Sequence, residues 1–235
     1  MIIPQALKAS QVTLLGYGAL LSESSSRLTF PDLTNFRHVR VKGLKRVFAH
    51  PHIYLVKEGL LDPSTSLHLA SLSAEKSQTE ESSFVVAAFD VTLDDVQREN
   101  FIRREPEYDI VSTEYYDLND DNGEKSHPLG NGVICLRSKD ENLRDIEYLH
   151  SISQNLKEKG GIWHWSEDSG LLPATIYLRH CLLAVEKAGG AAYESFLQET
   201  YLADRKTTLK EYMNEYGEEV MSSRPPSHLT QRFGG

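Results

Sequence analysis

Two short segments carry residue types that could perform chemistry. Residues 15–20 read Leu-Gly-Tyr-Gly-Ala-Leu, and residues 103–109 read Arg-Arg-Glu-Pro-Glu-Tyr-Asp. Consecutive backbone N–H groups in a glycine turn can bind an anion. A carboxylate placed at the end of a helix can act as a general base. Together the segments predict an enzyme with an anion-binding turn and one proton-transferring carboxylate.

The glycine turn follows residues 12–15, an apolar run that indicates a short buried strand. Gly16 and Gly18 allow positive φ angles and a close approach of the backbone to a ligand. The turn is not a dinucleotide fingerprint, because Leu21 occupies the position of the third glycine. It is not a phosphate-binding Walker loop either, because no Gly-Lys-Ser/Thr follows. Alone, the pattern is also typical of a tight exit from a strand.

Glu105 is the candidate general base. Pro106 disfavours helical geometry at the residue before it, so a helix should end near Arg104 and leave Glu105 just beyond its C-terminus. The partial negative charge there raises the proton affinity of a carboxylate, and an apolar pocket would raise it further. Arg103 and Arg104 would oppose this effect if they point inward. Glutamate is typically exposed, and Glu107 offers a second carboxylate.

The charge balance restricts the class of partner. The chain has 235 residues, with 25 Lys+Arg against 34 Asp+Glu and a net charge of −9. Broad binding to nucleic acid or to an anionic membrane needs a basic face, so neither is expected. No apolar run approaches the ~20 residues of a membrane span, and no secretory signal is apparent. We therefore expect a soluble, cytoplasmic protein whose partner is a small molecule.

The two cysteines, Cys135 and Cys181, do not indicate a zinc ribbon or a disulfide framework. They lie far apart in the sequence without a Cys-x-x-Cys pair, and each has apolar neighbours. Both are expected to be buried thiols in a reducing compartment.

Hydrophobic patterns predict an α+β fold. Alternating or continuous apolar runs predict strands at residues 12–15, 36–41, 46–49, 53–56, 67–72, 84–89, 108–118 and 133–136. One helix is expected between the strands at residues 84–89 and 108–118. It starts at Thr92, with Asp95 as the acid of a capping box. Further helices are expected at residues 140–159, 173–187, 191–202 and 207–216.

This pattern divides the chain into three parts. Residues 1–138 are expected to form a β-rich catalytic body, and residues 139–220 a helical segment packed on or beside it. Residues 221–235 are rich in Ser, Pro and Gly and are expected to be a loosely ordered tail.

The motifs resemble those of the gamma-glutamylcyclotransferase superfamily. The turn at residues 16–21 resembles the family's Tyr-Gly-Ser-Leu/Asn turn. The segment at residues 43–48, Gly-Leu-Lys-Arg-Val-Phe, resembles its Gly-x-x-Arg-x-Phe/Trp strand. Residues 104–109 are similar to the Arg-Glu…Tyr-Asp segment of the glutathione-specific branch, and residues 176–189 resemble a helix of that branch. The resemblance implies a mostly antiparallel mixed β-barrel with a helical C-terminal extension.

The resemblance also implies a reaction that needs no cofactor. The α-amine of a γ-glutamyl group attacks its own γ-carbonyl, which gives 5-oxoproline and releases an amine, such as cysteinylglycine from glutathione. Glu105 would be the acid/base catalyst, and no metal ligand is implied. The implied substrate-binding residues are Tyr17, Gly18, Ala19, Leu20, Arg46 and Tyr108.

Three alternatives remain open. Ala19 replaces the usual Ser, so a non-catalytic binding protein on the same fold is one of them. The sequence His50-Pro51-His52…Glu58 is near a cupin metal motif, although the second motif fails because Val133 stands where its histidine belongs. Residues 163–165, Trp-His-Trp, could form an aromatic lid or could pack between helices.

Overall fold

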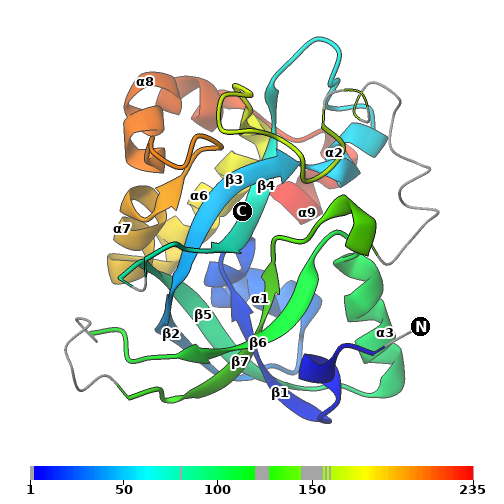
Figure 1. Cartoon of the computed structure of the whole chain (residues 1–235), viewed down its shortest axis with the longest axis vertical. Helices are drawn as coiled ribbons and strands as arrows, with labels where there is room; N and C mark the ends of the chain where they lie inside the picture. The colour runs from blue at the N-terminus through cyan, green and yellow to red at the C-terminus, as the bar shows by residue number, and fades with distance from the viewer. Residues whose placement is uncertain are drawn as a thin grey trace.

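One curled sheet organises the protein. The computed structural model describes residues 3–79, 81–119, 127–143, 156, 158 and 160–234. Within this part of the chain nine strands form a single sheet of order β2-β5-β1-β7-β4-β3-β9, with β6 paired to β7 and β8 paired to β4 (Figure 1). The strands are β1 Gln11–Gly16, β2 Thr34–Lys42, β3 Leu44–Pro51, β4 His68–Lys76, β5 Ser83–Thr92, β6 Asp109–Tyr115, β7 Gly130–Leu136, β8 Leu172–Pro173 and β9 Thr200–Tyr201.

The sheet is mixed and curls back on itself. Strands β1 and β5, β5 and β2, and β6 and β7 pair antiparallel, whereas β1 and β4 each join β7 by a parallel pair. Arg40 of β2 exchanges two backbone hydrogen bonds with Tyr116, which lies just beyond β6. The two sides of the sheet therefore meet, and the predicted α+β class with a mixed, barrel-like sheet is confirmed.

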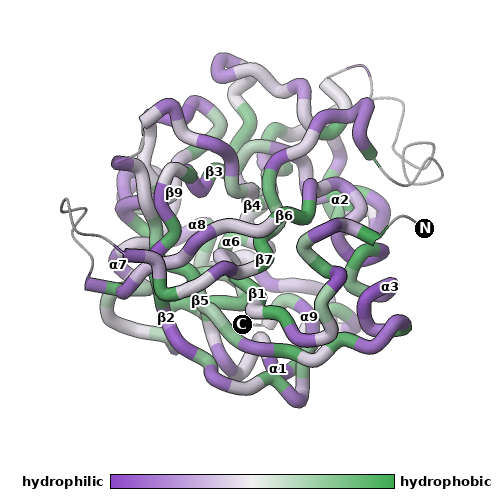
Figure 2. The backbone as a smooth tube through the Cα atoms, turned by 60° about the horizontal axis from the view of Figure 1, so that its bottom comes forward, coloured by the Kyte–Doolittle hydropathy of each residue, from purple (hydrophilic) through white to green (hydrophobic). Residues whose placement is uncertain are grey.

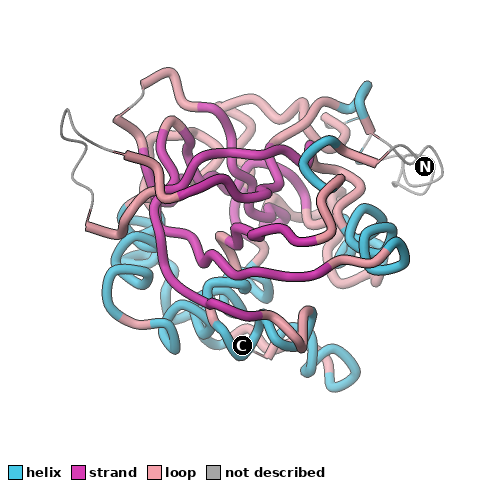
Figure 3. Tube along the Cα trace, turned by 90° about the horizontal axis from the view of Figure 1, so that it is seen from below, coloured by secondary structure: helices cyan, strands magenta, loops and turns pink. Residues whose placement is uncertain are grey.

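Helices cover the outside of this sheet. They are α1 Glu23–Thr29, α2 Ile53–Lys57, α3 Asp95–Arg104, α6 Thr175–Ala188, α7 Gly190–Gln198, α8 Leu209–Ser222 and α9 Thr230–Phe233, with short 3-10 helices η1 Gln5–Leu7, η2 Ala19–Leu21, η3 Asp140–Asn142 and η4 Ser227–Leu229. Helices α6, α7 and α8 lie together on one side of the sheet and α3 lies apart from them (Figure 1). Figure 3 shows the strands in the middle of the molecule with most of the helices outside them.

The strands and the C-terminal helices share one apolar core. Phe84 and Phe89 of β5, Leu178 of α6 and Phe196 of α7 are all buried in it. Helix α3 is mainly hydrophilic (Figure 2), and it contributes Ile102 as its buried apolar residue. Strand β9 pairs parallel with β3, which ties the segment after α7 directly to the sheet.

Two local predictions are wrong. The apolar run at residues 53–56 forms α2 rather than a strand, because the His52 side chain caps it by accepting the Leu55 N–H. Helix α3 is capped by Asp94 and Gln97, not by Thr92 and Asp95. Thr92 is still part of β5, so the chain leaves the sheet before the helix can begin.

The tail also differs from expectation. Two of its residues are anchored: Leu229 is 5% exposed and Phe233 is 3% exposed, and both pack against Leu55 and Ala174. Helix α1 was not predicted. The helix predicted at residues 140–159 falls largely outside the described residues. None of the described helices combines the length and the apolarity that crossing a bilayer requires.

Candidate active site

A cavity of about 590 Å³ opens where the end of β1, the end of α3 and helices α2, α6 and α9 meet. It brings together the glycine turn and the loop after α3, which lie far apart in the sequence. The cavity is lined by Leu14, Leu15, Gly16, Tyr17, Gly18, Ala19, Leu20, His52, Tyr54, Lys57, Ser71, Leu72, Phe101, Arg103, Arg104, Glu105, Pro106, Glu107, Tyr108, Val133, Cys135, Tyr177, His180, Arg232 and Phe233.

The glycines of the turn are required by close packing. A Cβ on Gly16 would collide with the side chain of Leu20, and a Cβ on Gly18 would lie 3.0 Å from the Tyr177 hydroxyl. Neither glycine has a positive φ angle, so the positive φ that the sequence allows is not used in this turn. The Tyr17 hydroxyl donates to the Cys135 carbonyl at 2.8 Å, which fixes the turn against β7.

The turn lines the cavity and begins a short 3-10 helix there. The 3-10 helix η2 starts at Ala19, and its first hydrogen bond runs from the Leu21 N–H to the Gly18 carbonyl. The opening N–H groups of a helix have no acceptor inside it. The N–H groups of Gly18 and Leu20 have no acceptor among the described residues, whereas the Ala19 N–H interacts with the Cys181 sulfur. The first two groups can therefore serve a ligand.

Glu105 lies just beyond the end of α3, as predicted. Its backbone leaves the helical region, and its N–H donates to the Phe101 carbonyl at 3.2 Å. The carboxylate lies 3.2 Å from Arg104 Nε and its side chain is 22% exposed. Burial raises the pKa of Glu105, while the charges of Arg104 and Arg232 act in the opposite direction. A carboxylate with a raised pKa is a stronger base than an ordinary one, which suits proton transfer.

Hydrogen bonds that involve buried side chains hold the loop that follows Glu105 in place. Trp163, which is 2% exposed, donates from its indole Nε1 to the Glu107 carbonyl at 2.8 Å. The Tyr108 hydroxyl donates to the Leu72 carbonyl at 2.8 Å. That hydroxyl therefore accepts from His50 Nε2 at 3.0 Å, which assigns the His50 proton to Nε2. Tyr108 lines the cavity, but its hydroxyl is committed to His50 and to the Leu72 carbonyl.

Arg46 does not line the cavity, so its predicted contact with a substrate carboxylate is corrected. It is fully buried, and its guanidinium lies between the rings of Phe84 and Phe196. It donates to Thr200 Oγ1 at 2.7 Å and to the Tyr17 carbonyl at 3.3 Å. Arg46 thus positions the turn from the core side.

The aromatic stretch 163–165 is packing rather than a lid. Trp163 is 2% exposed and Trp165 is 4% exposed, and the Trp163 ring lies 4.3 Å from the ring of His50. The cupin-like histidines do not converge either. His50 faces Trp163, His52 caps α2, and the described residues contain no group of three His, Cys, Asp or Glu side chains placed to hold a metal.

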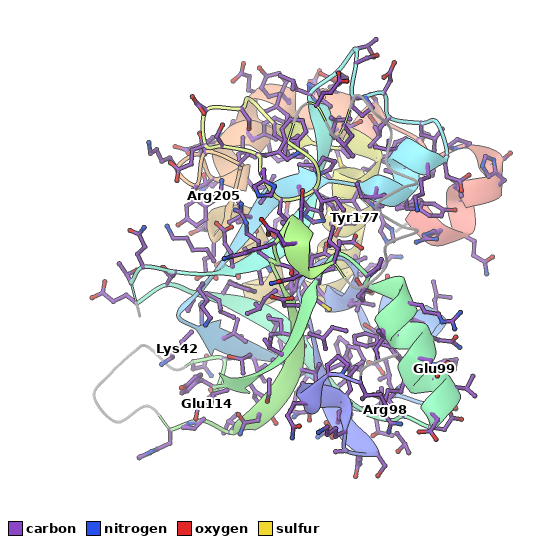
Figure 4. All side chains as sticks on the ribbon, turned by 45° about the vertical axis from the view of Figure 1, so that its right-hand side comes forward. Lys42, Arg98, Glu99, Glu114, Tyr177 and Arg205 are labelled. Atoms are coloured by element: carbon purple, nitrogen blue, oxygen red, sulfur yellow. The ribbon has the colours of Figure 1, made fainter. Side chains whose placement is uncertain are left out.

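The far wall of the cavity was missed by sequence reasoning. It consists of Tyr54 of α2, Tyr177 and His180 of α6, and Arg232 and Phe233 of α9. Tyr177 lies on α6, away from Lys42 and Glu114 (Figure 4). Its helix was recognised by resemblance, but the tail offered no signal except two isolated apolar residues.

The comparisons with known proteins give a fold likeness. No family model matches the sequence, and no curated protein sequence matches it. A yeast gamma-glutamyl cyclotransferase specific to glutathione is 14% identical, with a TM-score of 0.41 over 80% of this chain and 96% of that chain. A gamma-glutamyl cyclotransferase is 12% identical, with a TM-score of 0.39 over 63% and 79%. An uncharacterized human protein is 13% identical, with a TM-score of 0.40 over 64% and 80%. Gamma-glutamyl cyclotransferases are thus among the solved structures to which this chain is similar.

Proposed function

We propose that this protein cleaves a γ-glutamyl amide by intramolecular attack of the α-amine, giving 5-oxoproline and a free amine. One observation carries the proposal: Glu105, with its raised pKa, lines the same cavity as Gly18 and Leu20, whose N–H groups have no acceptor among the described residues. A base and an anion-binding turn are the two parts that such an acyl transfer needs.

Glu105 accepts a proton from the substrate α-ammonium, which frees the nitrogen lone pair to form the new C–N bond to the γ-carbonyl carbon. The oxygen of that carbonyl becomes negative and is stabilised by the N–H groups of Gly18 and Leu20. Protonated Glu105 then donates to the leaving nitrogen as the old C–N bond breaks. The new ring nitrogen then loses its extra proton. The released amine takes up this proton and leaves as an ammonium ion. No cofactor takes part in these steps.

The Ala19 substitution is compatible with this mechanism. The donors that face the developing oxyanion are backbone N–H groups, which do not depend on the side chain at position 19. Preorganised donors of this kind are typically worth ~3–4 kcal/mol each in transition-state stabilisation. The proposal of catalysis is therefore favoured over that of a binding protein without activity.

The test is incubation of the purified protein with glutathione and with a panel of γ-glutamyl amino acids and amines. We expect 5-oxoproline from at least one of them, quantified by chromatography, and its loss in Glu105→Gln. If no compound releases 5-oxoproline but one of them binds in calorimetry, the protein is a binding protein. If none reacts and none binds, the site does not serve γ-glutamyl compounds.

A further inference from the structure

Helix α9 closes one end of the cavity. The ring of Phe233 lies 5.6 Å from that of His52, 5.7 Å from that of His180 and 6.1 Å from that of Tyr54. Because Phe233 is 3% exposed, it anchors the helix in the wall. The neighbouring Arg232 is thereby placed in the cavity lining.

The Arg232 guanidinium is held by stacking and has no ionic partner among the described residues. Its central carbon lies 3.7 Å from the centroid of the Tyr54 ring. No described carboxylate or carbonyl accepts a hydrogen bond from it, although it lines the cavity. A guanidinium stacked on an aromatic face keeps its N–H edge for a planar anion, which it binds in two-pronged fashion.

The other two arginines of the cavity lining face carboxylates, and its two histidines are neutral. Arg104 is paired with Glu105 at 3.2 Å, and Arg103 lies 3.9 Å from Glu99. Burial lowers the pKa of His52 to about 3 and that of His180 to about 4, so both rings are neutral at neutral pH. The positive charge of Arg232 contributes to both shifts, which places its field inside the cavity.

Arg232 and the glycine turn lie at different ends of the cavity. Tyr177 separates them: its hydroxyl is 3.0 Å from the position of a Cβ on Gly18, and its ring is 4.8 Å from that of His52. Phe233 follows on the other side of His52. A substrate whose γ-glutamyl end occupies the turn would therefore extend its leaving group toward α9.

We infer that Arg232 binds a carboxylate on the leaving group, so that the substrates are γ-glutamyl amino acids or peptides rather than γ-glutamyl derivatives of simple amines. This inference rests on the proposed function for the reaction itself. It adds a specificity-determining residue from α9, a segment that supplies no proton donor or acceptor to the reaction, although the charge of Arg232 lowers the pKa of Glu105.

A matched pair of substrates tests the inference. γ-Glutamylalanine and γ-glutamylethylamine differ by one carboxylate on the leaving group. We expect the native protein to have the higher kcat/KM for γ-glutamylalanine, and Arg232→Gln to lower the ratio of the two kcat/KM values roughly tenfold, as expected for one charged hydrogen-bonding contact. The control is Arg224→Gln, whose guanidinium donates to the Met221 carbonyl at 2.6 Å and does not line the cavity.

An unchanged ratio of the two kcat/KM values in Arg232→Gln would overturn the inference. A higher kcat/KM of the native protein for γ-glutamylethylamine than for γ-glutamylalanine would also overturn it. If the native protein cyclises neither compound nor any other of the panel, the proposed function fails instead. Calorimetric binding of the same two compounds to the native protein and to Arg232→Gln then decides the inference. Equal affinities of the native protein for both would reject it.

Discussion

The two ends of the cavity are built in different ways. At the reaction end, the groups proposed to act are Glu105 and the backbone N–H groups of the turn, and they are held by hydrogen bonds from buried side chains. Arg46 donates to the Tyr17 carbonyl and Trp163 donates to the Glu107 carbonyl. At the α9 end, the lining consists of stacked rings and one guanidinium.

This difference separates catalysis from selection. Backbone donors can be aimed precisely only if the chain around them cannot shift, and buried hydrogen bonds provide that rigidity. Arg46 and Arg232 show the contrast within one residue type: Arg46 is fully buried and bound on all sides, whereas Arg232 is exposed and keeps its N–H edge free for a ligand. Changes at the reaction end should therefore affect kcat, and changes at the α9 end should affect KM.

The largest effect is expected from Glu105→Gln. The amide preserves the size of the side chain but cannot accept the substrate proton, so kcat should fall about 10²- to 10⁴-fold. Glu107→Gln is the matched control, because it changes the other carboxylate of the same loop in the same way, and it should retain most activity. Both are measured as 5-oxoproline release, with thermal unfolding to verify the fold. A larger loss in Glu107→Gln would move the general base to that residue.

The reaction end could be predicted from the sequence because each of its parts is local. The apolar run before Gly16 and the Pro106 stop after α3 place the turn and Glu105 correctly, and the strands follow the same short-range patterns. The role of Arg46 could not be predicted, because its partner Thr200 lies 154 positions away. Sequence spacing does not reveal which distant groups meet in a core.

The α9 end could not be predicted for a related reason. Leu229 and Phe233 are isolated apolar residues in a polar segment, and their burial depends on Leu55 and Ala174. A short helix of this kind is stabilised by tertiary contacts rather than by its own propensity. Arg232 therefore had no local pattern that could mark it as a functional residue.

Gly18→Ala tests the point where the two ends meet. The new Cβ would lie 3.0 Å from the Tyr177 hydroxyl, a contact tight enough that the hydroxyl must shift. We expect a loss of about 1–3 kcal/mol in the free energy of unfolding, as for other overpacked sites, together with lower kcat. In the double variant with Tyr177→Phe the colliding oxygen is absent, so part of both losses should be recovered. A double variant no better than Gly18→Ala would show that this contact is not the reason for the glycine.

Phe233→Ala tests whether the α9 end is separable from catalysis. Removal of this ring should release α9 locally, because the helix packs on a small cluster apart from the main core. KM for γ-glutamylalanine should rise several-fold while kcat and the unfolding temperature stay near native. Met221→Ala, at an exposed position on α8, is the control. A large fall in the unfolding temperature would instead make α9 part of the cooperative core.

Arg104→Gln should have the smallest effect, a shift in pH dependence. Glu105 acts in its ionised form, so activity declines as the pH falls through its pKa. Arg104 is the foremost of the groups that lower this pKa, and its removal should raise the pKa and move the acidic limb of kcat/KM to higher pH. The shift should be modest, because the Arg104 side chain is 44% exposed and solvent screens its charge. Arg103→Gln, whose side chain is 69% exposed, should leave the limb in place. A limb that stays fixed or moves to lower pH in Arg104→Gln would mean that it reports a group other than Glu105, and the assignment of the reaction end to this carboxylate would fail.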